Sequence, residues 1–415
     1  TTGKQNVAIG FESLYSNTNG LQNVSVGFKN LRANTTGSEN VAVGYETLFS
    51  NTTGHRNVAV GNQSLYYNIS GAFNIAIGKQ ALRQNKTSNN IGIGFEALQD
   101  NTTGRFNVAV GDRVLTTNTT GQFNVGLGYE TLLANTTANY NVAIGYQTLL
   151  SNTIGERNVA MGFESLRQNT TGQKNVAMGN QALRTNTTGF ENVAIGNAAM
   201  YTNTSGQKNV AIGTNVLVNN TIGQKNVAIG SGAMFTNTTG ITNVAIGSDA
   251  LNKNTIGSNN VAIGAQAVYT NTTGARNVGI GFDALRLNTI GQKNIAMGNS
   301  ALYSNTTGVE NIALGDAAMY TNTIGLRNVA IGTQALASNT TGSFNVALGY
   351  ATLYLNTTGQ FNVAIGYQTL KQNTIGASNT SVGNEALRNN TTGQNNVAMG
   401  RSALANNLTG QTNVS

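Results

Sequence analysis

The sequence contains no cysteine, no proline and no tryptophan, and its one histidine is His55. Without cysteine the chain can form no disulfide framework and no thiolate metal site. His55 occupies a variable position of a 17-residue repeat, where other copies hold Gln, Lys, Ser or Arg, so we expect a solvated turn residue. No apolar run approaches the roughly 18 residues of a membrane span, and no signal peptide opens the chain. We therefore expect no membrane insertion of this segment.

Charged side chains are also scarce, at 9% of the residues, and the formal net charge is +8. The 23 Lys and Arg residues are scattered along the chain. The fifth repeat position, for example, holds Arg56 and Lys174 in some copies but Glu39 and Glu191 in others. A nucleic-acid groove requires a continuous basic stripe, so we expect no nucleic-acid partner.

The pattern that is present is a five-residue segment, Asn6-Val7-Ala8-Ile9-Gly10, which returns every 17 residues. It defines 24 complete repeats between Thr1 and Asn407 and a partial repeat that reaches Ser415. Strict repetition predicts one continuous solenoid over residues 1–415, and we expect this segment to be a fragment of a longer chain. One repeat is a residue short, at Lys86-Thr87-Ser88-Asn89-Asn90, where we expect Ser88 to replace the usual turn glycine.

Each repeat predicts two short extended segments and two turns. Val7 and Ile9 alternate with Ala8 and are β-branched, which indicates a strand. Gly10 ends it, and all complete repeats keep this glycine, as at Gly27 and Gly44. The next six residues have one apolar anchor, Leu14, and are too few for a stable helix, so we predict a second strand there. The fold class is then an all-β parallel β-solenoid with one coil per repeat.

Asparagine fills positions 6 and 17 of every complete repeat. Stacking identical coils about 4.8 Å apart would let each amide donate to and accept from its copies in the neighbouring coils. We therefore predict two structural asparagine ladders. Their first members are Asn6, Asn17, Asn23, Asn34, Asn40 and Asn51.

The predicted strand is apolar on both faces. If Val7, Ile9 and Leu14 fill the coil interior, Ala8 forms a flat outer ridge that suits close packing against another chain. If Ala8 lines the interior, the outer Val and Ile side chains form an apolar patch larger than monomers tolerate. Either arrangement favours a homo-oligomer or a laterally packed fibre.

The segments Asn6–Gly10, Asn158–Gly162 and Asn362–Gly366 resemble the head-domain repeats of trimeric autotransporter adhesins, and related repeats of phage tail fibres and other surface fibres. The resemblance implies a left-handed parallel β-roll, three chains packed side by side and an extracellular location. This repeat is longer than is usual in that family.

No constellation of residues indicates catalysis. Carboxylates recur at position 12, as at Glu12 and Glu46, but Gln, Lys and Ala replace them elsewhere. This leaves no fixed pair for acid–base chemistry or metal binding, and the Gly-rich turns lack the context of a phosphate loop. The sequence predicts a non-enzyme without cofactor or metal.

A structural extracellular or virion-surface fibre is the function that these features favour. The alternative is an adhesin head that binds host matrix or glycan through exposed aromatic and arginine side chains. A third hypothesis is ice binding by the threonine columns at positions 1 and 2. Asn-x-Ser/Thr acceptor sequences, as at Asn34 and Asn51, leave glycosylation open, although copies with Thr-Ile-Gly lose the acceptor without disturbing the period.

Overall fold

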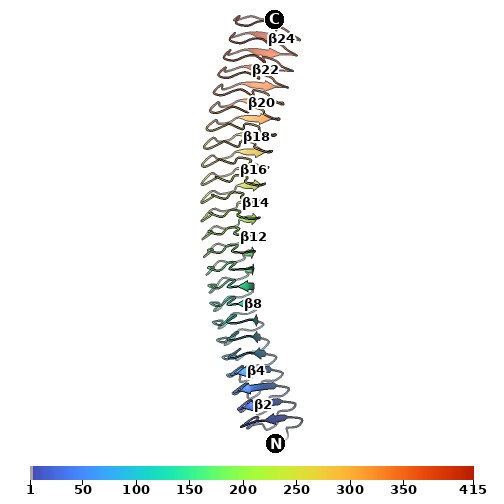
Figure 1. Ribbon diagram of the computed structural model, residues 1–415, viewed down its shortest axis with the longest axis vertical. Helices are drawn as coiled ribbons and strands as arrows, with labels where there is room; N and C mark the ends of the chain where they lie inside the picture. Colours follow the sequence, from blue (N-terminus) through green and yellow to red (C-terminus); the bar gives the residue numbers. More distant parts are fainter. Residues whose placement is uncertain (1–2) are drawn as a thin grey trace. The chain divides into compact units, whose positions relative to one another are not determined.

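The computed structural model describes residues 3–415, which fall into two compact units, residues 3–208 and 209–415. The described residues form strands, turns and bends but no helix, and so none that could cross a membrane. Each unit is a parallel β-solenoid in which one repeat makes one coil (Figure 1). The predicted fold class is therefore confirmed.

Within the first unit, the strands of neighbouring coils pair in parallel, and residues at the same repeat position face one another. Val159, for example, lies opposite Val142 and Val176. The strands are β1 (Val7–Ile9), β2 (Val24–Phe28), β3 (Val41–Tyr45), β4 (Val58–Asn62), β5 (Ile75–Ile77), β6 (Ile91–Ile93), β7 (Val108–Val110), β8 (Val125–Tyr129), β9 (Val142–Tyr146), β10 (Val159–Met161), β11 (Val176–Met178) and β12 (Val193–Ile195).

The second unit repeats this arrangement. Val244 lies opposite Val227 and Val261. Its strands are β13 (Val210–Ile212), β14 (Val227–Ile229), β15 (Val244–Ile246), β16 (Val261–Ile263), β17 (Val278–Ile280), β18 (Ile295–Met297), β19 (Ile312–Leu314), β20 (Val329–Ile331), β21 (Val346–Leu348), β22 (Val363–Ile365), β23 (Thr380–Val382) and β24 (Val397–Met399).

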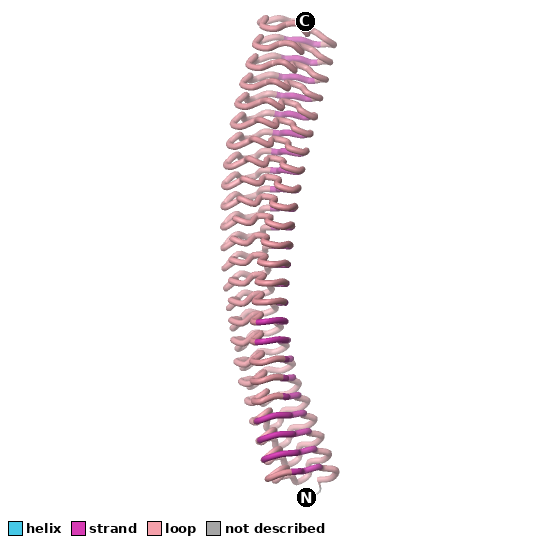
Figure 2. Tube along the Cα trace, in the orientation of Figure 1, coloured by secondary structure: helices cyan, strands magenta, loops and turns pink. Residues whose placement is uncertain are grey.

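The second strand predicted at positions 11–16 is wrong, because each coil has one strand and the rest is turn (Figure 2). Positions 12 and 14 adopt left-handed backbone conformations, with φ of 52° at Glu46 and 49° at Leu48. These reversals do not interrupt the bonding between coils. The Leu48 N–H donates to the Ser64 carbonyl at 3.0 Å, and the Glu46 N–H donates to the Phe28 carbonyl at 2.8 Å.

The same reversals direct two consecutive side chains, at positions 13 and 14, into the interior. Thr47 and Leu48 are both fully buried, whereas a strand would have placed them on opposite faces. Opposite them, the strand contributes its alanine, and Ala42 is also fully buried. The interior is therefore lined by alanine, leucine and small residues. Of the two arrangements that the sequence left open, the one with Val and Ile inside is excluded.

The glycine at position 10 is required for two reasons. Gly27 has φ of 130° and Gly44 has φ of 138°, values that residues with a side chain rarely adopt. A Cβ atom on Gly27 would also overlap the carbonyl oxygen of Gly44 in the next coil. The predicted turn glycines therefore close the corner where stacked backbones come nearest.

Candidate functional site

The asparagine column at position 6 connects three coils through each side chain. Asn40 donates from its backbone N–H and from Nδ2 to Oδ1 of Asn23, at 3.0 and 3.1 Å. Its Nδ2 also donates to the carbonyl of Gly54 in the next coil at 2.9 Å. Asn57 in turn donates to Oδ1 of Asn40. Every polar atom of this buried amide is paired, so the predicted ladder is confirmed.

The column at position 17 is built in the same way. Nδ2 of Asn51 donates to Oδ1 of Asn34 at 2.8 Å and to the carbonyl of Gly54 at 3.1 Å. Both side chains are fully buried. Both Nδ2 hydrogen bonds of Asn51 lie inside the coil, so its side chain is not exposed at the surface of the folded chain. The two ladders meet at the Gly54 carbonyl, which accepts from both.

The one-residue deletion interrupts the position 17 ladder. Nδ2 of Asn85 donates to the carbonyl of Thr87 at 2.7 Å, and Oδ1 of Asn68 is buried with no partner. The Thr87 carbonyl also accepts from Asn74, as a turn glycine does in other coils. Thr87 therefore replaces the glycine, and the expectation that Ser88 does so is wrong.

The outward side chains at positions 7 and 9 form what we call the strand face. Most of its members are partly exposed in both units, with exposed fractions of 37% at Ile246, 36% at Ile263 and 41% at Ile331. Because the strands pair in register, nearly every coil adds one Val or Ile at position 7, where only Thr380 is polar, and one Ile, Val, Leu or Met at position 9. Val7 and Ile9 belong to this face, and Ala8 and Leu14 to the interior columns.

Aromatic rings at position 11 extend the strand face in parts of the chain. Phe28 stacks on Tyr45 with ring centroids 5.0 Å apart, and Tyr129 stacks on Tyr146 at 5.3 Å. In the second unit Tyr350 stacks on Tyr367 at 5.5 Å. The aromatics noted in the sequence thus pack against their copies in neighbouring coils.

Charges at position 5 pair along their own column. Glu310 contacts Lys293 and Arg327, both at 2.9 Å. Hydrogen bonds from Lys293 and then Arg327 lower the pKa of the exposed Glu310 carboxyl below its ordinary value. Glu164 lies at position 12, outside this column. Burial raises the pKa of its carboxyl group, but hydrogen bonds from Arg184 and Gln181 outweigh this effect, so the net pKa is lowered.

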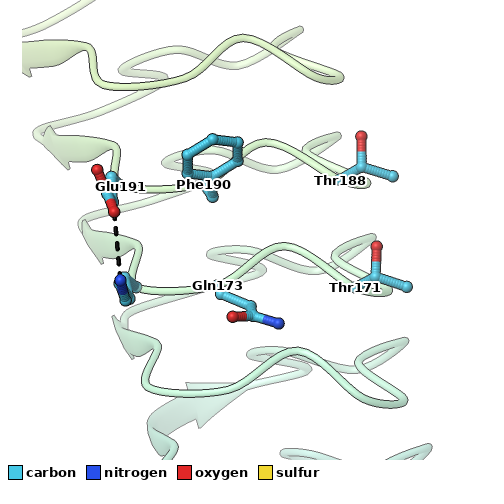
Figure 3. A pocket seen from close by; sticks show the side chains of 6 residues that line it. Thr171, Gln173, Thr188, Phe190 and Glu191 are labelled. Atoms are coloured by element: carbon cyan, nitrogen blue, oxygen red, sulfur yellow. Dashed lines mark hydrogen bonds and ion pairs between the residues drawn. The ribbon is translucent and has the colours of Figure 1, made fainter.

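A hollow of about 370 Å³ lies beside this column in the first unit. Figure 3 shows Thr171 and Thr188 at one side of it and Gln173 and Phe190 between them and the strand side. Lys174 and Glu191 close it with an ion pair of 3.3 Å. Its charged groups already satisfy one another, so they offer no free charge to a ligand.

In parts of the chain, position 15 carries aromatic rings and guanidinium groups that lie against one another in neighbouring coils. The Arg32 guanidinium carbon lies 5.6 Å from the Tyr15 ring and 5.7 Å from the Phe49 ring. Arg286 lies in the same way between Tyr269 and Tyr303, at 5.9 and 5.7 Å.

The buried column at position 13 was also missed. The small size of its side chains could have identified it, since this position holds only Ala, Ser, Thr, Val and one Asn, Asn30.

Within residues 3–415, no group of three or more His, Asp or Glu side chains is arranged to hold a metal ion. His55 packs edge-on against Phe73 with ring centroids 5.4 Å apart. The sequence matches no known family model, and no curated protein matches it either.

Proposed function

We propose that this protein is a structural fibre outside the cell or on a virion surface, with no enzymatic activity. In this role copies of the chain associate side by side through the strand face. The observation that carries the proposal is the repeated outward Val and Ile column, in which Ile246 and Ile263 are each more than a third exposed.

The size of this apolar surface supports association. Monomeric proteins rarely expose contiguous apolar patches beyond about 300–600 Å². The strand face gains two apolar side chains with nearly every coil, and each unit has twelve strands. A second copy offers a face with the same spacing, so covering one face covers the other. The resemblance to surface-fibre repeats adds a trimer as the expected assembly and an extracellular location.

Sedimentation velocity tests the assembly. We expect the wild-type chain to sediment as an elongated oligomer, and a variant with Ile246, Ile263 and Ile280 replaced by Lys to sediment as a monomer. The matched control replaces Ile256, Ile290 and Ile324 by Lys, since these isoleucines are 51–53% exposed but lie at turn position 2. A compact wild-type monomer, or equal dissociation of both variants, would contradict the proposal.

The alternative is an adhesin that binds host matrix or glycan, and the exposed aromatic columns favour it as a second candidate. A saturable ligand in glycan-array or matrix-binding assays separates an adhesin from a pure spacer. Ice binding gains less support, because threonine hydroxyls at position 1 are engaged within the solenoid. Oγ1 of Thr35, for example, donates to the Thr52 carbonyl at 3.1 Å. A thermal-hysteresis measurement decides that case.

A further inference from the structure

The column at position 15 contains a gap in the second unit. Tyr303 stacks on Tyr320 with ring centroids 5.0 Å apart and an interplanar angle of 12°. The next two coils place Ala337 and then Tyr354 at this position. Ala337 is 8% exposed and forms the floor of a hollow of about 320 Å³, with Tyr320 and Tyr354 at its two ends. Since coils stack about 4.8 Å apart, the two tyrosines are separated by the space of one missing planar group.

The same column shows what occupies such a space when it is filled. Arg286 lies between Tyr269 and Tyr303, and its Nε forms an ion pair with Asp283 at 3.3 Å. Arg32 lies between two rings and pairs with Glu12 at 2.6 Å. Each of these cations thus has a carboxylate at position 12.

The hollow at Ala337 differs in its polar groups from the places that Arg32 and Arg286 fill. No Asp or Glu lines it, and position 12 supplies Gln334 instead. Lys371 follows Tyr354 at position 15 of the next coil, which disfavours a cation. Within residues 3–415 the Gln334 amide and the Ser338 hydroxyl make no side-chain hydrogen bond, so both can donate to and accept from a ligand.

We propose that this hollow binds a neutral six-membered ring that carries hydroxyl groups, such as one hexose unit of a glycan. The ring would stack between Tyr320 and Tyr354, and its hydroxyls would bond to Gln334 and Ser338 at the rim. The two tyrosine faces supply the stacking surface, and the uncharged rim selects against guanidinium and ammonium groups. This inference rests on the adhesin alternative and not on the structural role.

Saturation-transfer difference NMR on the full chain tests the site. The probes are the methyl β-glycosides of glucose, galactose and N-acetylglucosamine at millimolar concentration, with methylguanidinium and p-cresol as comparisons. We expect ring-proton signals from at least one glycoside. Ala337→Arg fills the gap as Arg286 does and should reduce that signal tenfold or more. Ala405→Arg is the matched control, because Ala405 occupies position 15 without flanking tyrosines, and should leave it unchanged.

A second variant, Tyr354→Leu, removes one stacking face and should also reduce the glycoside signal at least tenfold. Retention of the far-ultraviolet circular dichroism spectrum verifies that each variant is folded. The proposal is overturned if the wild-type chain gives no glycoside signal, if Ala337→Arg keeps the signal, or if only methylguanidinium or p-cresol responds. A chain that associates laterally yet binds no glycoside would refute this site and leave the structural role standing.

Discussion

Each ladder asparagine bonds to the coil before it and to the coil after it. Nδ2 of Asn254 donates to Oδ1 of Asn237 at 2.8 Å and to the Gly257 carbonyl at 2.9 Å. Oδ1 of Asn254 accepts from Asn271 at 2.8 Å. Replacing Asn254 therefore affects two neighbours as well as the residue itself.

We predict that Asn254→Ala lowers the free energy of unfolding by about 3 kcal/mol, because a buried group left without its partner costs about 1–3 kcal/mol. Here Oδ1 of Asn237 and Nδ2 of Asn271 both lose a partner. Urea denaturation followed by circular dichroism measures the change. Gln292→Ala is the control, since Gln292 is exposed, and it should stay within about 0.5 kcal/mol of the wild type. Equal effects of the two substitutions would argue against the ladder as a source of stability.

Two buried serines at position 8 give opposite predictions. Ser381 has a buried hydroxyl with no partner, whereas the Ser25 hydroxyl contacts Ser13 at 2.6 Å and donates to the Asn30 carbonyl at 3.2 Å. We expect Ser381→Ala to stabilise the chain by about 1 kcal/mol and Ser25→Ala to destabilise it by about the same amount. Thermal unfolding of the two variants checks this, and shifts of the same sign would contradict it.

The ladders and the corner glycines could be predicted because their requirements are chemical and local. An amide that must pair with its own copies tolerates no other residue, and only glycine fits at Gly27. The left-handed conformations of Leu48 and Glu46 could not be predicted in this way. Neither residue type favours positive φ, and the conformation is held by hydrogen bonds to neighbouring coils.

At the scale of one coil, the segment from position 11 to position 16 shows why the second strand was wrong. A strand would have sent the side chains of positions 13 and 14 to opposite faces. The interior needs both of them, because Ala42 is small and leaves space that Thr47 and Leu48 fill together. The residues of this segment favour neither helix nor strand clearly. What makes both side chains point inward is the small alanine of the strand on the opposite side of the coil, which the segment itself does not reveal.

The short coil offers a test at the same scale. Inserting Thr between Lys86 and Thr87 and replacing Thr87 by Gly restores the usual Asn-x-Thr-Gly turn. We expect Nδ2 of Asn85 to reach Oδ1 of Asn68, which now has no partner, and the free energy of unfolding to rise by about 1–2 kcal/mol. The longer turn costs little in loop entropy.

Amide hydrogen exchange around residues 68–101 measures this repair. Slower exchange there than in the wild type is the expected result, because the two neighbouring coils would be joined by the restored bond. The same Thr insertion without Thr87→Gly is the control. Faster exchange in the repaired chain would show that the shortened coil is already the better-packed arrangement.

At the scale of the whole molecule, the sequence showed that Val and Ile share one face of the strand and Ala the other. It did not show which of the two faces points into the interior. Val and Ile are the larger apolar residues and would ordinarily be placed inside. They lie outside because the interior between the strand and the turn segment is narrow, and position 8 within it is mostly alanine, with only serine and glycine in its place. Knowing that position 13 also points inward would have decided the question.

Acid is the last test, because the bonds between coils are mostly uncharged. The ladders and the backbone bonds do not titrate, and shifted carboxyl pKa values are confined among the described residues to Glu39, Glu164 and Glu310, all lowered. A carboxyl group with a lowered folded-state pKa stabilises the fold above its unfolded pKa and loses this contribution as the pH falls through the folded value. Stability should therefore be flat from about pH 8 to 5 and decline modestly below the ordinary carboxyl pKa of 4.5.

Urea midpoints measured by circular dichroism across this range check the expectation. A variant with Glu39, Glu164 and Glu310 replaced by Gln should have a slightly lower midpoint at neutral pH and a shallower decline in acid, since it has no such carboxylates to protonate. Complete loss of the β-sheet signal above about pH 4 would contradict it, because so few paired carboxylates cannot hold the fold together. Persistence of the signal when every carboxylate is neutral would mean that amide and backbone bonds suffice against the repulsion of 23 lysines and arginines.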